Sequence, residues 1–217
     1  MGQDLSGVSS KISDQDSEKL WHKSYQAGVP REIQYGDLNS VGDLLESSAK
    51  EFSDHVAYYS MGAKLTYSEF EVVSRNFAAF LQKDLKLSVG ERVAIMLPNL
   101  LQFPIGLFGI LRAGCVAVPC NPLYTARELE HQLQDSGAST IIILEDFAHI
   151  LAATKSQIKN VILAKVGDCL GFAKGGAIDF YRKFIKREVP SYNFSVDNLA
   201  FKTLSFRKAP SLGASIH

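Results

Sequence analysis

The sequence has no excess charge of either sign, few cysteines and no long apolar run, and each absence excludes a class of protein. Lys plus Arg and Asp plus Glu number 23 each, so the formal net charge is zero. This balance removes the usual electrostatic argument for nucleic acid as a partner. The apolar stretch 103–111 is nine residues long, against about 20 for a transmembrane helix. The opening residues 1–19 are polar and lack the apolar core of a secretory signal.

Cysteine is also scarce, with only Cys115, Cys120 and Cys169 present. Their number is odd and two of them lie in apolar stretches, which favours reduced thiols in a cytosolic protein over a disulfide framework. None belongs to a Cys or His set at zinc spacing, so no metal site is expected.

The common phosphate-binding and nucleophile motifs are missing as well. Gly109 and Gly114 have P-loop spacing, but Cys115 and Val116 follow them where Lys and Ser or Thr are required. Neither the dinucleotide pattern G-x-G-x-x-G nor the nucleophile pattern G-x-S-x-G occurs. His131 and His149 have no triad partners in any recognised pattern and are interpreted as surface or packing residues. We therefore expect no catalytic, cofactor-binding or metal-binding residue in this chain.

What is present is a regular alternation of helical and strand patterns from residue 40 onward. Two T-x-x-E capping boxes, Thr66 with Glu69 and Thr125 with Glu128, mark helix starts. Apolar runs of five to seven residues lie between the helical segments, as in βαβ units. The expected helices are 41–52, 66–84, 99–113 and 126–136, and the expected strands are 56–60, 64–67, 92–97, 115–119, 140–144 and 160–166. This pattern predicts an α/β fold with a largely parallel sheet flanked by helices, and the runs at 115–119 and 140–144 predict strands covered on both faces.

Composition divides the chain into four segments. Residues 1–17 are rich in Ser, Asp, Gln and Lys and are expected to be a disordered tail. Residues 18–170 carry the α/β pattern, 171–190 form a basic segment with aromatic residues, and 191–217 are expected to be an irregular C-terminal tail.

The basic segment is open to two interpretations. From about 176 to 188 it predicts an amphipathic helix that ends before Pro190. Its periodicity favours a helix whose Phe and Ile stripe packs on the sheet while its charges face solvent. Aromatic residues beside cations also suit contact with an anionic membrane. The residues that would make that contact are Lys174, Arg182, Lys183, Lys186 and Arg187.

Several segments resemble known proteins. Residues 64–70 (KLTYSEF) and 110–138 (ILRAGCVAVPCNPLYTARELEHQLQDSGA) resemble the first two core motifs of the adenylate-forming superfamily. The run 92–114, with WHKSYQAGVPREI near the start and AKGGAIDFYRKFIKREVP, is similar to bacterial long-chain fatty acyl-CoA synthetases. The resemblance covers residues 18–208.

The resemblance implies an incomplete N-terminal subdomain of a long-chain-fatty-acid–CoA ligase. The full family uses ATP, Mg and CoA to convert a fatty acid first to an acyl-adenylate and then to acyl-CoA. Its phosphate loop, of the kind YTGGTTG, is missing here, so this chain alone is expected to be inactive and to bind no cofactor. The alternative is a module derived from the ligase that binds a partner or the inner face of the membrane from the cytoplasm. An apolar face left uncovered would favour self-association.

Overall fold

The computed structural model describes residues 19–33, 36, 38–194 and 202–206. The chain divides into two units, Met1–Asp37 and Leu38–His217. The described part of the first unit contains one short 3-10 helix, η1 (Leu20–Ser24). In this part of the chain, the centre of the His22 ring lies 6.2 Å from that of Trp21 and 5.5 Å from that of Tyr25. The tail predicted for residues 1–17 lies outside the described residues.

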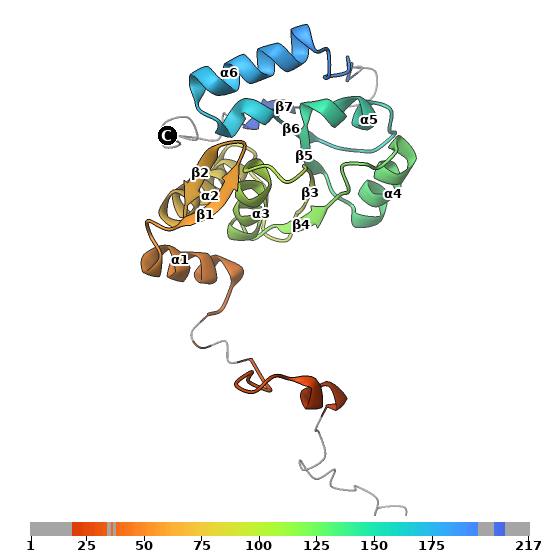
Figure 1. The fold of residues 1–217 in the computed structure, drawn as a ribbon. Coiled ribbons are helices and arrows are strands. Elements are labelled where there is room, and N and C mark those ends of the chain that lie inside the picture. Colours follow the sequence, from red (N-terminus) through yellow and green to blue (C-terminus); the bar gives the residue numbers. More distant parts are fainter. Residues whose placement is uncertain (1–18, 34–35, 37, 195–201, 207–217) are drawn as a thin grey trace, which may run out of the picture. The chain divides into compact units, whose positions relative to one another are not determined.

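The second unit is built around a five-stranded sheet with the strand order β4-β3-β5-β6-β7 (Figure 1). Every neighbouring pair in it is parallel. The strands are β3 (Arg92–Met96), β4 (Val116–Pro119), β5 (Thr140–Leu144), β6 (Asn160–Ala164) and β7 (Lys202–Ser205). The helices around them are α1 (Val41–Glu51), α2 (Tyr67–Lys83), α3 (Gln102–Arg112), α4 (Ala126–Ser136), α5 (Ala148–Ala152) and α6 (Phe172–Phe180). The predicted α/β class with a parallel sheet is confirmed.

Both capping boxes form as the sequence predicts. The Thr66 hydroxyl accepts from the Glu69 N–H, and a Glu69 carboxylate oxygen accepts from the Thr66 N–H at 2.8 Å. Thr125 and Glu128 repeat the arrangement at the start of α4. Each box satisfies two backbone N–H groups that the first helical turn leaves without partners.

Side chains of the central strands alternate between two cores, one on each face of the sheet. Ile95, Ile142 and Ile162 face the core formed with α2 and α3. Met96 and Ile141 belong to the second core, with α4 and α5. Figure 1 shows these helix pairs on the two sides of the sheet. Buried strands of a parallel sheet are apolar on both faces, which explains the near-continuous Ile and Val runs.

A separate hairpin is formed by β1 (Val56–Ser60) and β2 (Ala63–Thr66). Met61 and Gly62 connect the strands with φ of 51° and 80°. Two consecutive positive φ angles characterise the tight turn that matches the twist of antiparallel strands.

Two strands differ from the sequence prediction. β4 was expected to be covered on both faces, but it is an edge strand in which Val116 is exposed. β7 lies within 191–217, where an irregular stretch was predicted. The mostly polar segment Lys202–Ser205 gives no strand signal, yet it pairs with β6 as β7. The following residue, Phe206, is fully buried, and its ring centre lies 4.9 Å from that of Phe77.

The predicted amphipathic helix also differs in its limits. α6 begins at Phe172 and continues through a π-helical segment, η4 (Tyr181–Ile185). It ends because Arg187 adopts a left-handed φ of 54° and the Glu188 N–H donates to the Arg182 carbonyl, a C-terminal capping arrangement. Pro190 therefore lies beyond the end of the helix. Within the described residues no helix is both long and apolar enough to cross a membrane.

Candidate functional site at the carboxyl edge of the sheet

The carboxyl ends of β3, β5 and β6 place polar residues along one edge of the sheet. β4 pairs with one side of β3, and the next strand, β5, pairs with the other side, so the strand order reverses direction at β3. Parallel α/β sheets bind ligands outside the carboxyl ends of their strands at such a reversal. Here β5 is followed directly by Glu145 and Asp146, and β6 by Lys165. A ligand site is therefore expected at this edge.

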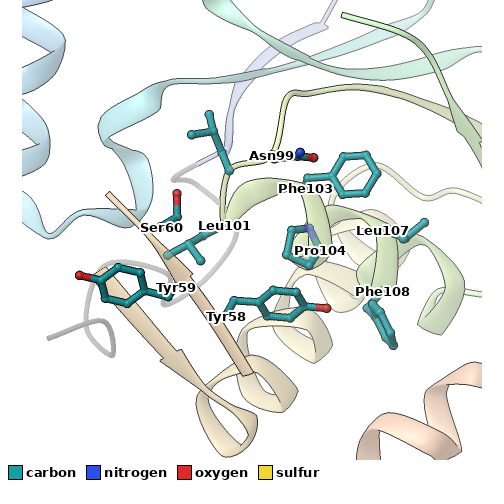
Figure 2. Close-up of a pocket in the computed structure, with 10 residues that line it drawn as sticks. Tyr58, Tyr59, Ser60, Asn99, Leu101, Phe103, Pro104, Leu107 and Phe108 are labelled. Atoms are coloured by element: carbon teal, nitrogen blue, oxygen red, sulfur yellow. The ribbon is translucent and has the colours of Figure 1, made fainter. Parts of the chain in front are cut away.

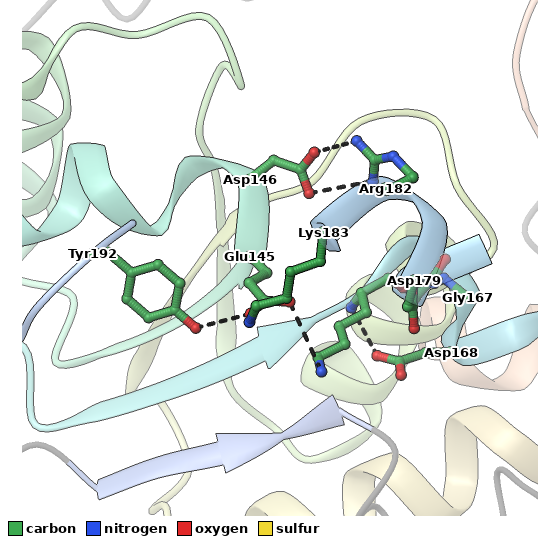
Figure 3. A network of polar contacts seen from close by, with 10 residues as sticks. Glu145, Asp146, Gly167, Asp168, Asp179, Arg182, Lys183 and Tyr192 are labelled. Atoms are coloured by element: carbon green, nitrogen blue, oxygen red, sulfur yellow. Dashed lines mark hydrogen bonds and ion pairs between the residues drawn. The ribbon is translucent and has the colours of Figure 1, made fainter. Parts of the chain in front are cut away.

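Glu145 is the centre of a buried polar network (Figure 3). Its carboxylate accepts from Lys183 Nζ at 2.7 Å and from the Tyr192 hydroxyl at 3.2 Å, and Lys165 Nζ lies 3.8 Å away. Burial would raise the pKa of the Glu145 carboxyl, but the Lys183 hydrogen bond, the charges of Lys165 and Lys183, and Tyr192 together lower it. Burial and the Glu145 charge raise the pKa of Tyr192 to about 12. Glu145 is therefore held ionised and Tyr192 held as a neutral donor.

Asp146 forms the second half of the network. Its carboxylate accepts from both terminal nitrogens of Arg182, in the two-pronged geometry that the planar guanidinium favours. Arg182 Nε also donates to Glu188 at 3.0 Å. Burial alone would lower the pKa of Arg182, but Asp146 and then Glu188 raise it. Two consecutive acids at the end of β5 thus bind two consecutive cations of η4.

Further contacts hold α6 along its length. The Asp179 carboxylate accepts from the Gly167 N–H at 2.8 Å. Gly167 lies in the 3-10 helix η3 (Val166–Cys169), and its backbone approaches Gly175 of α6 so closely that a Cβ on Gly175 would lie 2.0 Å from the Gly167 carbonyl oxygen. Lys174 Nζ donates to the Met61 carbonyl in the β1–β2 turn at 2.8 Å. These contacts hold α6 against this edge of the sheet along the length of the helix.

These contacts orient the basic segment, residues 171–190, in the opposite way to the one expected from its sequence. The sequence favoured apolar residues packed on the sheet and charges in solvent, but Arg182 and Lys183 face the body of the unit. Phe180, Phe184 and Ile185 are exposed instead. The reason is the Glu145–Asp146 pair, which offers the two cations carboxylate partners, one buried and one partly buried, that Phe and Ile cannot use. Of the five residues proposed for membrane contact, Lys174, Arg182 and Lys183 make contacts within the unit. All five except Arg182 are exposed.

Sequence analysis did not single out Glu145 and Asp146. The sequence contained a signal for them, because the two acids directly follow the apolar run TIIIL and must therefore lie at the carboxyl edge of the sheet. Gln102 was also missed. It is buried at the start of α3 and donates to the Lys165 carbonyl at 2.6 Å, which ties α3 to the loop after β6.

An apolar groove of about 320 Å³ lies beside this edge, between β1 and α3 (Figure 2). Its volume is at the lower end of the roughly 300–1,000 Å³ range of small-molecule pockets. Burial, with a smaller effect of Tyr67, raises the pKa of Tyr58, which therefore stays protonated. The lining residues are Tyr58, Tyr59, Ser60, Asn99, Leu100, Leu101, Phe103, Pro104, Leu107 and Phe108. This surface suits an apolar group better than a charged one.

The described residues do not fit a polyphosphate or a metal ion at this edge. Arg182 and Lys183 are paired with carboxylates that would repel phosphate. Across the described ranges, no group of three or more His, Cys, Asp or Glu side chains is placed to hold a metal ion. Cys115, Cys120 and Cys169 are buried and outside any disulfide, and burial raises the pKa of Cys120 to about 11, which keeps it an unreactive thiol. The described residues at this edge hold α6 in place, and they include no nucleophile–base pair.

The Glu145 network predicts a loss of stability in acid. Because the folded pKa of Glu145 lies below its ordinary value of 4.5, its contribution is complete above that value and disappears as the pH falls through the folded pKa. Glu145→Gln should reduce the free energy of unfolding by about 1–2 kcal/mol at pH 7, the scale of a hydrogen bond to a charged group. The wild-type advantage should shrink towards pH 3 in urea titrations. As a control, Glu51→Gln at an exposed position should change the free energy of unfolding by less than about 0.5 kcal/mol. If the difference between the wild type and Glu145→Gln did not depend on pH, the role given to the Glu145 charge would be wrong.

Comparison with known proteins gives a consistent result. The family model described as AMP-binding enzyme matches residues 45–201. A long-chain-fatty-acid–CoA ligase of Yersinia pestis is 49% identical over 189 residues, which covers 86% of this chain and 34% of that protein. The corresponding ligase of Escherichia coli O6:H1 is 48% identical over 188 residues, with 86% and 33% covered. The structure of a benzoate CoA ligase from Burkholderia xenovorans shares the fold, with a TM-score of 0.55 at 23% identity over 58% of this chain and 26% of that one. The chain thus spans about a third of the length of the curated relatives it matches.

Proposed function

The chain belongs to the AMP-binding enzyme family, and on that premise we propose that it is the N-terminal part of a ligase that joins long-chain fatty acids to coenzyme A. The observation that carries this proposal is an identity of 48–49% with ligases of that printed name over 86% of the chain. Two proteins this similar over so long a segment share their core packing, and the parallel sheet with helices on both faces supports the same assignment.

Within such a ligase, this chain would supply structure to the reaction. Its sheet, capped helices and fastened α6 hold the carboxyl edge in one conformation. ATP, Mg²⁺ and CoA would be held by other parts of the ligase, because the cations at this edge are committed to Glu145 and Asp146. The fatty acid is the proposed acyl substrate. Buried free thiols support a reducing, cytoplasmic location.

The proposal is tested by exchanging segments with the E. coli relative. The 188-residue matching segment of that ligase is replaced by the corresponding segment of this chain, and palmitoyl-CoA formation from palmitate, ATP and CoA is measured. We expect the chimera to keep a rate within about tenfold of the parent, since volume-conserving changes in a core cost little. This chain alone, assayed in parallel, should form neither palmitoyl-adenylate nor palmitoyl-CoA. A folded chimera without activity, or an active isolated chain, would contradict the proposal.

A further inference from the structure

A polar pocket of about 400 Å³ lies at the opposite edge of the sheet, where β5 and β6 begin. Its lining residues come from 133–139, the end of α4 with the loop into β5, and from 155–159, the loop between α5 and β6. Its volume is within the range of small-molecule pockets. We call it the amino-edge pocket, and the proposed function makes no use of it.

Hydrogen bonds between its walls fix the shape of the amino-edge pocket. The Lys159 N–H donates to the Ser139 carbonyl at 2.7 Å, which joins the two loops. The Lys155 N–H donates to the Glu130 carboxylate of α4 at 2.9 Å. Between the two lysines, Ser156 is buried, so the middle of this loop is seated on the core. The walls are therefore in place before a ligand arrives, and binding does not have to order them.

The amino-edge pocket carries positive charge. Lys155 and Lys159 line it, and no Asp or Glu among the described residues does. In the part of the chain that the structure describes, neither lysine ammonium forms an ion pair. Glu130, behind the wall, already accepts from the Gln134 amide at 3.3 Å and from the Lys155 N–H. Gln157 adds a side-chain amide to the lining. Two uncompensated cations beside an amide donor suit an anion with several acceptor oxygens.

We propose that the amino-edge pocket binds a phosphate group, either as free phosphate or as part of a small phosphorylated metabolite. The ammonium groups of Lys155 and Lys159 meet the charge of the phosphate, and the Gln157 amide donates to one of its oxygens. Free phosphate and a phosphate monoester share this chemistry, and a monoester also fills the space that the phosphate leaves.

The position of the pocket separates it from the reaction proposed for the ligase. The five residues of β5, about 13 Å of extended chain, lie between the pocket and the carboxyl edge of the sheet. A phosphate group at the amino edge therefore takes no part in chemistry at the other edge. It acts by holding α4 and the two loops together, and it stabilises the folded unit in proportion to its occupancy.

Titration of the full chain with inorganic phosphate at constant ionic strength tests the proposal. We expect saturable NMR shifts of the backbone amides of 137–139 and 155–159, with a dissociation constant on the order of 1 mM, as for a small ion in an open site. Glycerol 3-phosphate distinguishes the two sources. Binding more than about fivefold tighter than that of phosphate assigns the pocket to a phosphorylated metabolite, and binding within that factor assigns it to free phosphate.

A double variant tests the two cations. Lys155→Gln with Lys159→Gln should weaken phosphate binding at least about tenfold, since each exposed charge pair contributes up to about fivefold. The matched control is Lys23→Gln with Lys64→Gln, which removes the same charge from two exposed positions outside the pocket. It should leave the dissociation constant within about twofold of the wild type, because salt screens distant charges. Circular dichroism checks that each variant is folded, as expected for exposed positions.

Two results would overturn the proposal. The first is the absence of saturable shifts at 137–139 and 155–159 up to about 50 mM phosphate, well above the expected dissociation constant. The second is equal binding by the two double variants, which would show only a general attraction of anions to the chain. Neither titration uses fatty acid, ATP or CoA. Failure of phosphate binding would leave the chimera result intact, and an inactive chimera would leave the phosphate result intact.

Discussion

Gly175→Ala is expected to release α6 from the carboxyl edge of the sheet. A Cβ at this position would lie 2.0 Å from the Gly167 carbonyl oxygen, a backbone atom that no side-chain rotation can move. The helix must shift, and with it the Arg182–Asp146 and Lys183–Glu145 pairs lengthen. Overpacking of this kind costs about 1–3 kcal/mol, and strained ion pairs add to it. We expect a lower melting temperature and much faster tryptic cleavage after Arg182 and Lys183.

The neighbouring residue provides a matched control. A Cβ on Gly176 would meet nothing within 4 Å. Gly176→Ala should therefore stabilise the helix by about 0.5–1 kcal/mol through its higher helix propensity, and tryptic cleavage should slow. Equal behaviour of the two variants would show that the close approach of Gly167 and Gly175 does not hold α6 in place.

Phe77→Ala is expected to have the largest effect on stability. Phe77 is fully buried on α2, and its ring lies against Phe80 and Phe206. It also contacts Gly109 of α3, where a Cβ would lie 2.6 Å from the Phe77 ring. The side chain therefore joins α2, α3 and the residue that follows β7. Truncation of a buried Phe costs about 3–5 kcal/mol, a large part of the roughly 5–15 kcal/mol that stabilises a typical domain.

Urea denaturation measures this loss directly. Phe172→Ala removes the same side chain at a highly exposed position and should change the free energy of unfolding by less than about 0.5 kcal/mol. A loss below about 1 kcal/mol for Phe77→Ala would mean that the core of α2 and α3 is not packed as described.

Most of the fold could be predicted because its signals are local. Thr66 with Glu69 and Thr125 with Glu128 fixed two helix starts, and TIIIL marked a buried strand. β7 escaped prediction because a strand of Lys, Thr, Leu and Ser is defined by its pairing with β6 rather than by its composition. The edge position of β4 escaped for the same reason, since strand order is set by tertiary contacts.

The orientation of α6 could not be read from periodicity. A stripe of Phe and Ile normally faces the core, and that rule holds when the core offers only apolar surface. Here Glu145 offers a buried carboxylate and Asp146 a partly buried one, so the cations of η4 contact the carboxylates and the aromatic residues turn outward. A prediction of this orientation needs the spatial neighbourhood of residues 36 to 38 positions apart in the chain.

The rate of palmitoyl-CoA formation by the E. coli chimera shows whether this chain can serve as the N-terminal part of a long-chain-fatty-acid–CoA ligase. We expect an active chimera whose activity survives Phe172→Ala and is lost with Phe77→Ala, since the chain contributes its packed sheet and not a reacting group. A chimera that melts like the parent ligase but forms no palmitoyl-CoA would contradict the account.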